Sequence, residues 1–165
     1  MIHILGDNSN SKLTGVQDGD SQPNAIDLRL GKVFEINKTP FELSEGYKKH
    51  RGTLEIDHDE DGWYHLEEGT YEVVMENVVT VGADEAGWVI TRSTLNRNGV
   101  FITSGLYDSG YNGVMAGAMH VRGGPVRIQK GTRVAQFLLF KAEALTLYNG
   151  SYGLNSEHDK KYTKE

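Results

Sequence analysis

The sequence predicts an all-β fold, in the form of a sandwich, a barrel or a jelly roll. Two observations support this prediction. Short apolar runs recur along the chain between turns, and the 20 glycines are spread fairly evenly. In addition, no long segment keeps the 3.6-residue apolar period of an amphipathic helix. Many short strands at this spacing are typical of closed or two-layered sheets.

The length and composition predict one globular domain. With 165 residues, of which 38% are hydrophobic and 24% charged, the chain can bury a core of its own. The sequence contains no internal repeat and no boundary between domains. We therefore expect residues 1–148 to form a single β domain. The polar stretch 149–165 is either a frayed tail or a flexible arm that closes over a ligand.

The charge balance argues against several partners. A net charge of −6 does not suit nonspecific binding to nucleic acid, which needs a basic surface. The absence of cysteine excludes disulfide bonds and thiolate chemistry. No apolar run approaches the ~18 residues of a membrane span, and the first residues do not resemble a signal peptide. We expect a cytoplasmic protein that binds neither nucleic acid nor a membrane.

The first third of the chain predicts one long strand between loops. Residues 1–20 are polar and predicted to be loop, with at most a short strand at 2–5. Residues 25–36 alternate apolar and polar side chains, break at Gly31 and resume, which predicts a strand with a bulge or turn. Residues 38–51 are polar and are predicted to be irregular.

The acidic run at residues 55–61 has two interpretations. Its carboxylates and one histidine would suit a metal site, or the run forms a solvated acidic loop. The spacing matches no calcium-loop pattern, which favours the loop.

The remaining elements follow in order. Residues 83–87 are predicted to form a short turn or one helical turn, and residues 93–98 a single helical turn with Ser93 as its N-cap. The predicted strands are 63–66, 70–81, 88–91, 100–103, 114–121, 126–129, 133–140 and 144–148.

Arg92, Ser93 and Arg97 are the first candidate site residues. A guanidinium offers a bidentate fork to a phosphate, and a hydroxyl in a turn adds another donor. The alternative is a surface arginine beside a serine that caps a helix. Taken alone, the segment favours the second interpretation.

Residues 105–113 form the second candidate. Three glycines in nine residues allow the backbone to approach a ligand, as in a β-hairpin pocket. Within this segment, Asp108 could accept a proton from water and Tyr111 could pack on a sugar, where a ribose 2′-hydroxyl would collide. The alternative is an ordinary turn with Tyr111 in the core.

Arg133 and Gln136 form the third candidate, after the turn at Gly131. Three residues apart on a regular strand, they would point to opposite faces of the sheet. Either one of them is structural, or the site is shared between subunits. The six histidines show no zinc-ligand spacing, and no nucleophile elbow or phosphate-binding loop is present.

Four segments together resemble the family of trimeric dUTPases and dCTP deaminases. QPNAIDLRLG at 22–31 resembles the N-terminal signature of the deaminase branch, and RSTLNRNG at 92–99 resembles the RSSLxRxG motif. GLYDSGYNG at 105–113 matches the GxxDxxYxG pattern of dUTPases, and GTRVAQ at 131–136 matches their GxRxAQ motif. The resemblance covers most of the chain, and the four motifs occur in the expected order.

This resemblance implies a distorted jelly-roll fold, a homotrimer with sites at the subunit interfaces, and a deoxynucleoside triphosphate substrate with Mg²⁺ held chiefly by its phosphates. It implies that Asp108 activates water and that Tyr111 excludes ribose. Backbone groups near Gly105 would read the base. Contacts to the phosphates would come from Arg92, Ser93, Arg97 and Gln136. Asp27 matches the aspartate of the first dUTPase motif, with either a structural role or an indirect one at the metal.

Ala118 distinguishes the two branches. The resemblance implies a catalytic glutamate at this position in deaminases, and no acid lies between Asp108 and Glu143 here. His120, two residues on, is a candidate substitute on the same strand face. We therefore expect dUTP hydrolysis to dUMP and pyrophosphate. The alternatives are dCTP deamination, alone or combined with hydrolysis, and a non-catalytic trimer that senses a nucleotide or binds a protein.

The C-terminal stretch departs from the glycine-rich arm of typical dUTPases and resembles a deaminase tail. This favours a functional arm at 149–165, with Lys161 and Tyr162 as contacts to the triphosphate.

Overall fold

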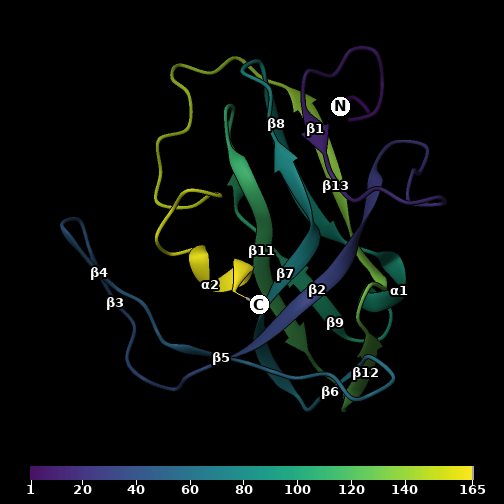
Figure 1. Ribbon diagram of the computed structural model, residues 1–165, viewed down its shortest axis with the longest axis vertical. Helices are drawn as coiled ribbons and strands as arrows, with labels where there is room; N and C mark the ends of the chain where they lie inside the picture. Colours follow the sequence, from purple (N-terminus) through teal and green to yellow (C-terminus); the bar gives the residue numbers. More distant parts are fainter. Residues whose placement is uncertain (165) are drawn as a thin grey trace.

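The computed structural model describes residues 1–164, and its strands form one curled sheet with small additions (Figure 1). The sheet order is β10-β8-β13-β2-β7-β11-β9, with β1 paired to β7 and β5 to β2, and every pair is antiparallel. The strands of this sheet are β1 (Lys12–Leu13), β2 (Ile26–Ile36), β5 (Thr53–Glu55), β7 (Gly69–Thr80), β8 (Glu85–Thr91), β9 (Val100–Thr103), β10 (Leu106–Tyr107), β11 (Asn112–Val121) and β13 (Arg133–Lys141).

The strand β2 joins the two halves of the sheet. Its first residues pair with β13, and from Leu30 onwards it pairs with β7. The register shifts at this point, which confirms the irregularity predicted at Gly31. A Cβ atom on Gly31 would lie 2.9 Å from the carbonyl oxygen of Val74, so only glycine allows the strands to approach this closely.

The curl of the sheet encloses the core. The edge strand β9 folds back beside β8, where the Thr91 hydroxyl donates to the Ile102 carbonyl and accepts from its amide. The inward side chains of both halves therefore pack against each other, as the alternating pattern predicted. The largest fully buried apolar side chains are Phe137, Ile26, Leu28, Leu30, Leu66, Met115, Met119 and Leu139.

Two small hairpins lie outside this sheet. The strands β6 (Trp63–Leu66) and β12 (Val126–Gln129) pair with each other. The strands β3 (Glu42–Ser44) and β4 (Tyr47–Lys49) form a second hairpin, which projects from the body at the left of Figure 1. Residues 38–51 were expected to be irregular, which was wrong for this hairpin. Its six strand residues are all exposed, so it leaves no burial pattern in the sequence.

Two further predictions differ from the structure. Residues 144–148 form no strand, because this stretch runs over the surface, where Leu145 is 99% exposed. The predicted helical turn exists as α1 (Ser93–Asn96), but the N-cap residue is Arg92 and no side chain caps it. The second helix is α2 (Lys160–Thr163). Neither helix in residues 1–164 has the length or the apolar content needed to cross a membrane.

Candidate functional site

Asp27 on β2 is the centre of one cluster of candidate site residues. Its side chain is fully buried, and the Nε2 of Gln136 donates to its Oδ1 at 3.0 Å. Its Oδ2 lies 3.3 Å from the Nε of Arg92 and 3.5 Å from the Nη1 of Arg133. The structure therefore brings together three of the motifs that are far apart in the sequence: those at Asp27, at Arg92 and at Arg133 with Gln136.

A bulge in β13 explains how Arg133 and Gln136 reach the same carboxylate. The pairing register with β2 shifts between Arg133 and Ala135, so the simple alternation of side chains is reset. The prediction that the two residues point to opposite faces was therefore wrong. A shared site between subunits is not needed to explain their spacing.

The Asp27 cluster can bind an anion. A buried carboxylate needs cationic partners, and here two guanidinium groups serve one carboxylate, leaving a surplus of positive charge. The side chains of Arg92 and Arg133 remain 29% and 35% exposed, so an anion can reach them. Ser93 and Arg97 lie next to Arg92 on and just after α1, and both are exposed.

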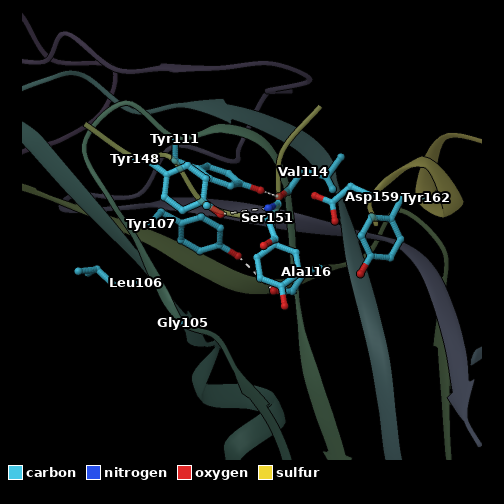
Figure 2. A pocket seen from close by; sticks show the side chains of 12 residues that line it. Gly105, Leu106, Tyr107, Tyr111, Val114, Ala116, Tyr148, Ser151, Asp159 and Tyr162 are labelled. Atoms are coloured by element: carbon cyan, nitrogen blue, oxygen red, sulfur yellow. Dashed lines mark hydrogen bonds between the residues drawn. The ribbon is translucent and has the colours of Figure 1, made fainter. Parts of the chain in front are cut away.

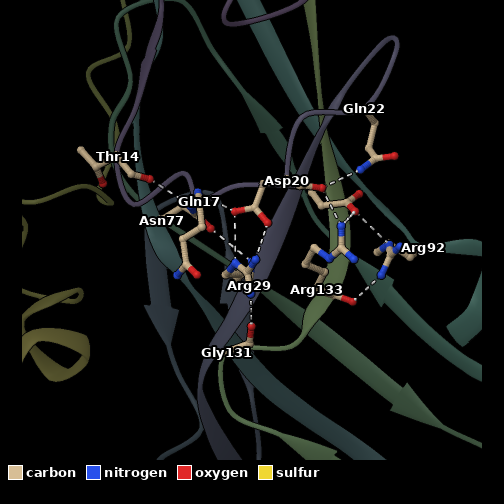
Figure 3. A network of polar contacts seen from close by, with 11 residues as sticks. Thr14, Gln17, Asp20, Gln22, Arg29, Asn77, Arg92, Gly131 and Arg133 are labelled. Carbon is tan, nitrogen blue, oxygen red and sulfur yellow. Dashed lines mark hydrogen bonds and ion pairs between the residues drawn. The ribbon is translucent and has the colours of Figure 1, made fainter.

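A second polar network holds Arg133 in place, and the sequence analysis missed it (Figure 3). The Nη2 of Arg29 donates to the buried Asp20 at 2.6 Å, and its Nη1 donates to the Gly131 carbonyl at 2.9 Å. Burial raises the pKa of Asp20, but the hydrogen bonds from Arg29 and the Gln17 amide lower it below its ordinary value. The loop fixed in this way presents the Gly19 carbonyl to the Nη1 of Arg133 at 2.6 Å.

A cavity of about 430 Å³, the aromatic cavity, lies at the other candidate segment (Figure 2). The Tyr111 hydroxyl donates to the Val114 carbonyl at 2.7 Å, and the Tyr107 hydroxyl donates to the Ala116 carbonyl at 3.2 Å. Burial raises the pKa of both tyrosines, so their hydroxyls remain donors. The lining residues are Gly105, Leu106, Tyr107, Tyr111, Val114, Ala116, Tyr148, Gly150, Ser151, Tyr152, Asp159 and Tyr162.

The segment 105–113 is not the expected hairpin, because the strands on either side of its turn do not pair with each other. Its first strand, β10, pairs with β8, whereas β11 pairs with β7 and β9. Asp108 is exposed at this turn and lines a separate hollow of about 610 Å³ together with residues 142–150. Tyr111 was predicted either to pack on a ligand or to lie in the core. It is 5% exposed and belongs to the core, and it also lines the aromatic cavity.

Asp108 and Arg92 lie at opposite ends of β8. Tyr107 pairs with Gly87, which places Asp108 beside the start of β8, while Arg92 directly follows its end. Along β8, the position beside Asp108 and the position of Arg92 are six residues apart, which corresponds to about 20 Å at ~3.3 Å per residue. One protomer therefore does not bring Asp108 to the same phosphate as Arg92.

The C-terminal segment packs on its own protomer. Tyr162 is 8% exposed, contacts the Phe34 ring and donates its hydroxyl to Glu72. The Nζ of Lys161 lies 2.8 Å from the same carboxylate. In the described contacts, Lys161 and Tyr162 thus meet Glu72 rather than the Asp27 cluster.

Glu72 is a further candidate site residue that no sequence motif indicates. In the ladder between β7 and β11 it is the register partner of Ala118, so both side chains lie on one face of the sheet. No local pattern marks Glu72, since it comes 46 residues before Ala118 and only the strand pairing joins them. On the same pair of strands, a hydrogen bond of 3.1 Å joins the Nδ1 of His120 and the Oγ1 of Thr70.

The described residues contain no group of three or more histidine or carboxylate side chains arranged to hold a metal ion. In the acidic run, Asp59 instead accepts hydrogen bonds from the Trp63 amide at 2.8 Å and from His65 at 2.7 Å. This part of the chain is an exposed loop with its own turn contacts.

Comparison with known proteins gives consistent matches. The profile of the dCTP deaminase-like family matches residues 2–142. A probable deoxyuridine 5'-triphosphate nucleotidohydrolase from Methanococcoides burtonii is 31% identical over 142 residues, covering 82% of this chain and 82% of the relative. A protein of the same description from Methanopyrus kandleri is 33% identical over 134 residues, covering 80% and 86%.

Solved structures agree on the fold. The 2'-deoxycytidine 5'-triphosphate deaminase from Agrobacterium tumefaciens aligns with a TM-score of 0.61 and 20% identity over 82% of this chain, which spans only 45% of that protein. A dUTPase from phage phi11 of S. aureus aligns with a TM-score of 0.52 and 12% identity, covering 88% of this chain and 98% of that one. The predicted jelly-roll architecture is confirmed.

Proposed function

The chain belongs to the dCTP deaminase-like family, and on this premise we propose that it is a dUTP diphosphatase, which converts dUTP to dUMP and pyrophosphate. The observation that carries the proposal is the turn at Asp108. It presents an exposed carboxylate next to Tyr111, which lines the aromatic cavity. The relatives that are about 31% identical over 82% of the chain bear the name of this activity.

In the proposed reaction Asp108 takes a proton from water while the water oxygen bonds to the α-phosphorus and pyrophosphate leaves. The uracil base lies in the aromatic cavity, where backbone groups from Gly105 onwards read its edge. The ring of Tyr111 packs on the deoxyribose and leaves no space for a 2′-hydroxyl. The buried hydroxyl bond of Tyr111 to Val114 supports this role, since it fixes the ring.

We further propose that the cluster around Asp27 binds the triphosphate. Arg92, Ser93, Arg97 and Gln136 supply donors, and the exposed edges of the guanidinium groups supply charge. Mg²⁺ held chiefly by the phosphates of the nucleotide would neutralise part of their charge. Asp27 does not suit direct ligation of the metal, because two guanidinium nitrogens already lie 3.3 and 3.5 Å from its Oδ2.

The separation of Asp108 from Arg92 supports a homotrimer with shared sites. If the two residues act on one nucleotide, they must come from different protomers, since about 20 Å separates them within one. A closed ring of identical subunits provides such a heterologous contact at every interface. Lys161 and Tyr162 then contact the triphosphate from the C-terminal arm.

The Asp108→Asn variant tests this proposal. With Mg²⁺ and dUTP, we expect the wild-type protein to release dUMP and pyrophosphate in equal amounts. The variant removes the base but keeps the size of the side chain, so kcat should fall by about 10²–10⁴-fold with little change in binding. Asp84→Asn is a matched control, because Asp84 is also exposed and lies outside the proposed site.

Two results would contradict the proposal. One is a wild-type protein that leaves dUTP unchanged from pH 6 to 9. The other is a variant that hydrolyses dUTP as fast as the wild type. Tight binding of nucleotides without turnover would instead favour a non-catalytic nucleotide sensor.

Deamination of dCTP remains a second candidate, favoured by the position of Glu72. This carboxylate lies across the strand pair from Ala118, where a proton-transfer group could serve a base in the adjoining cavity. Release of ammonia from dCTP, and its loss in Glu72→Gln, would support this activity. The same product assay therefore separates hydrolysis, deamination and simple binding.

A further inference from the structure

A second cavity adjoins the aromatic cavity and differs from it in charge. It has a volume of about 380 Å³ and shares three lining residues, Ala116, Tyr152 and Tyr162, with the aromatic cavity. We call it the hairpin cavity, because it lies between the stretch that follows β4 and the C-terminal segment. Its other lining residues are Ile36, Phe41, His50, Arg51, Thr53, Glu72, Gly117, Ala118, His158 and Lys161.

The hairpin cavity carries uncompensated positive charge. Its one carboxylate, on Glu72, is already bound by the Lys161 ammonium and the Tyr162 hydroxyl. Within residues 1–164, no carboxylate lies in ion-pair distance of the Arg51 guanidinium. Its Nε donates to the Thr39 carbonyl at 3.0 Å, which fixes one edge of the fork and leaves the Nη groups available.

Two histidines line the same cavity. The rings of His50 and His158 lie 4.7 Å apart at their centroids. Burial lowers the pKa of His50, and the charges of His158, Lys48 and Lys161 lower it further. The neutral ring of His50 can still donate one N–H to an anion, whereas the Nδ1 of His158 already lies 2.9 Å from the Oδ1 of Asp159.

We propose that the hairpin cavity receives the phosphate chain of a nucleotide whose base lies in the aromatic cavity, with Arg51 as a phosphate-binding residue and His50 beside it. This rests on the proposed function, because it assigns the base to the aromatic cavity. The two cavities share three lining residues, and their total size suits one nucleotide. The first is lined by aromatic rings and the second contains the guanidinium of Arg51, which matches the two ends of such a ligand.

The assignment also gives the projecting hairpin β3–β4 a role. The chain leaves this hairpin directly into His50 and Arg51, and the Nζ of Lys48 lies 5.4 Å from the ring centre of Tyr152. The hairpin and the C-terminal segment thus form two walls of one cavity. The Asp27 cluster of a neighbouring protomer would approach the phosphates from the open side.

Inorganic tripolyphosphate is the probe for this cavity, because it carries the phosphate chain without base or sugar. We expect it to bind the wild-type protein in calorimetry and to inhibit dUTP hydrolysis competitively. Arg51→Gln should weaken its binding about tenfold and raise the KM for dUTP by a similar factor, with kcat within about threefold. Lys49→Gln is the matched control, since Lys49 is an exposed cation on β4 outside the cavity.

Equal tripolyphosphate affinities of the wild type, Arg51→Gln and Lys49→Gln would overturn the inference, as would an equal loss in both variants. Thermal unfolding of each variant shows whether it is folded, and Arg51→Lys provides a second variant that keeps the charge and should bind with an intermediate affinity. Absence of dUTP hydrolysis would refute the proposed function alone, because the calorimetric comparison needs no turnover.

Discussion

At the residue scale, Asp27 holds together side chains from three motifs. Its carboxylate is buried, and Arg92, Arg133 and Gln136 all contact it. The sequence motifs indicate each of these residues, but they do not show that their side chains are in contact. That information comes from the bulge between Arg133 and Ala135, a backbone feature that has no clear signature in side-chain pattern.

The Asp27→Asn variant tests this role. An amide has the same shape but no charge, so the two guanidinium groups lose their shared counterion. We expect the free energy of unfolding to fall by about 2 kcal/mol, because a hydrogen bond to a charged group, such as that from Gln136, contributes ~1.5–3 kcal/mol and the ion pairs with the partly exposed arginines are screened by solvent. Urea denaturation measures the change, with Asp18→Asn on the exposed neighbouring loop as control. A variant as stable as the control would show that Asp27 does not organise the cluster.

At the scale of elements, the strands were predictable and their partners were not. The β6, β9 and β12 strands have the predicted bounds because alternating side chains record which residues face the core. Pairing depends on contacts between distant segments, so neither the β10–β8 ladder nor the position of Glu72 opposite Ala118 could be read from the chain. The surface stretch 144–148 has the composition of a strand but no partner within the described residues.

The junction between the N-terminal loop and β8 gives a prediction about pH. Glu85 is fully buried and accepts hydrogen bonds from the Asn10 amide at 2.8 Å, from Lys141 at 2.9 Å and from the Ser11 hydroxyl. Burial raises the pKa of Glu85, but these hydrogen bonds together lower it below its ordinary value. The stability gained is therefore fully present above the unfolded pKa of about 4.3 and is lost as the pH falls through the lower folded pKa.

We expect the melting temperature of the wild-type protein to fall as the pH drops below about 4.3. The Glu85→Gln variant should be less stable than the wild type at neutral pH, by about 2 kcal/mol. Its melting temperature should also depend less steeply on pH in the acidic range. Some dependence of the melting temperature on pH should remain in this variant, since the pKa of Asp20 is lowered as well. Melting curves from pH 3 to 7 measure both effects, and parallel curves for the two proteins would contradict the assignment to Glu85.

At the scale of the whole molecule, the two halves of the proposed site lie far apart within one protomer. Arg92 and Asp108 stand at opposite ends of β8, about 20 Å apart. The sequence motifs gave the residues and the family, but motif order along the chain carries no information about which copy supplies each group. If both residues contact one nucleotide, they must come from different copies of the chain, as in the homotrimer proposed above.

The most direct test is complementation between two inactive variants. Asp108→Asn and Arg92→Ala are each expected to lose dUTP hydrolysis when assayed alone. After the two proteins are mixed in equal amounts, unfolded and refolded together, random assembly places an intact Asp108 opposite an intact Arg92 in about a quarter of the shared sites. The mixture should therefore recover about a quarter of the wild-type activity, measured as pyrophosphate released from dUTP. A mixture no more active than its separate components would contradict it.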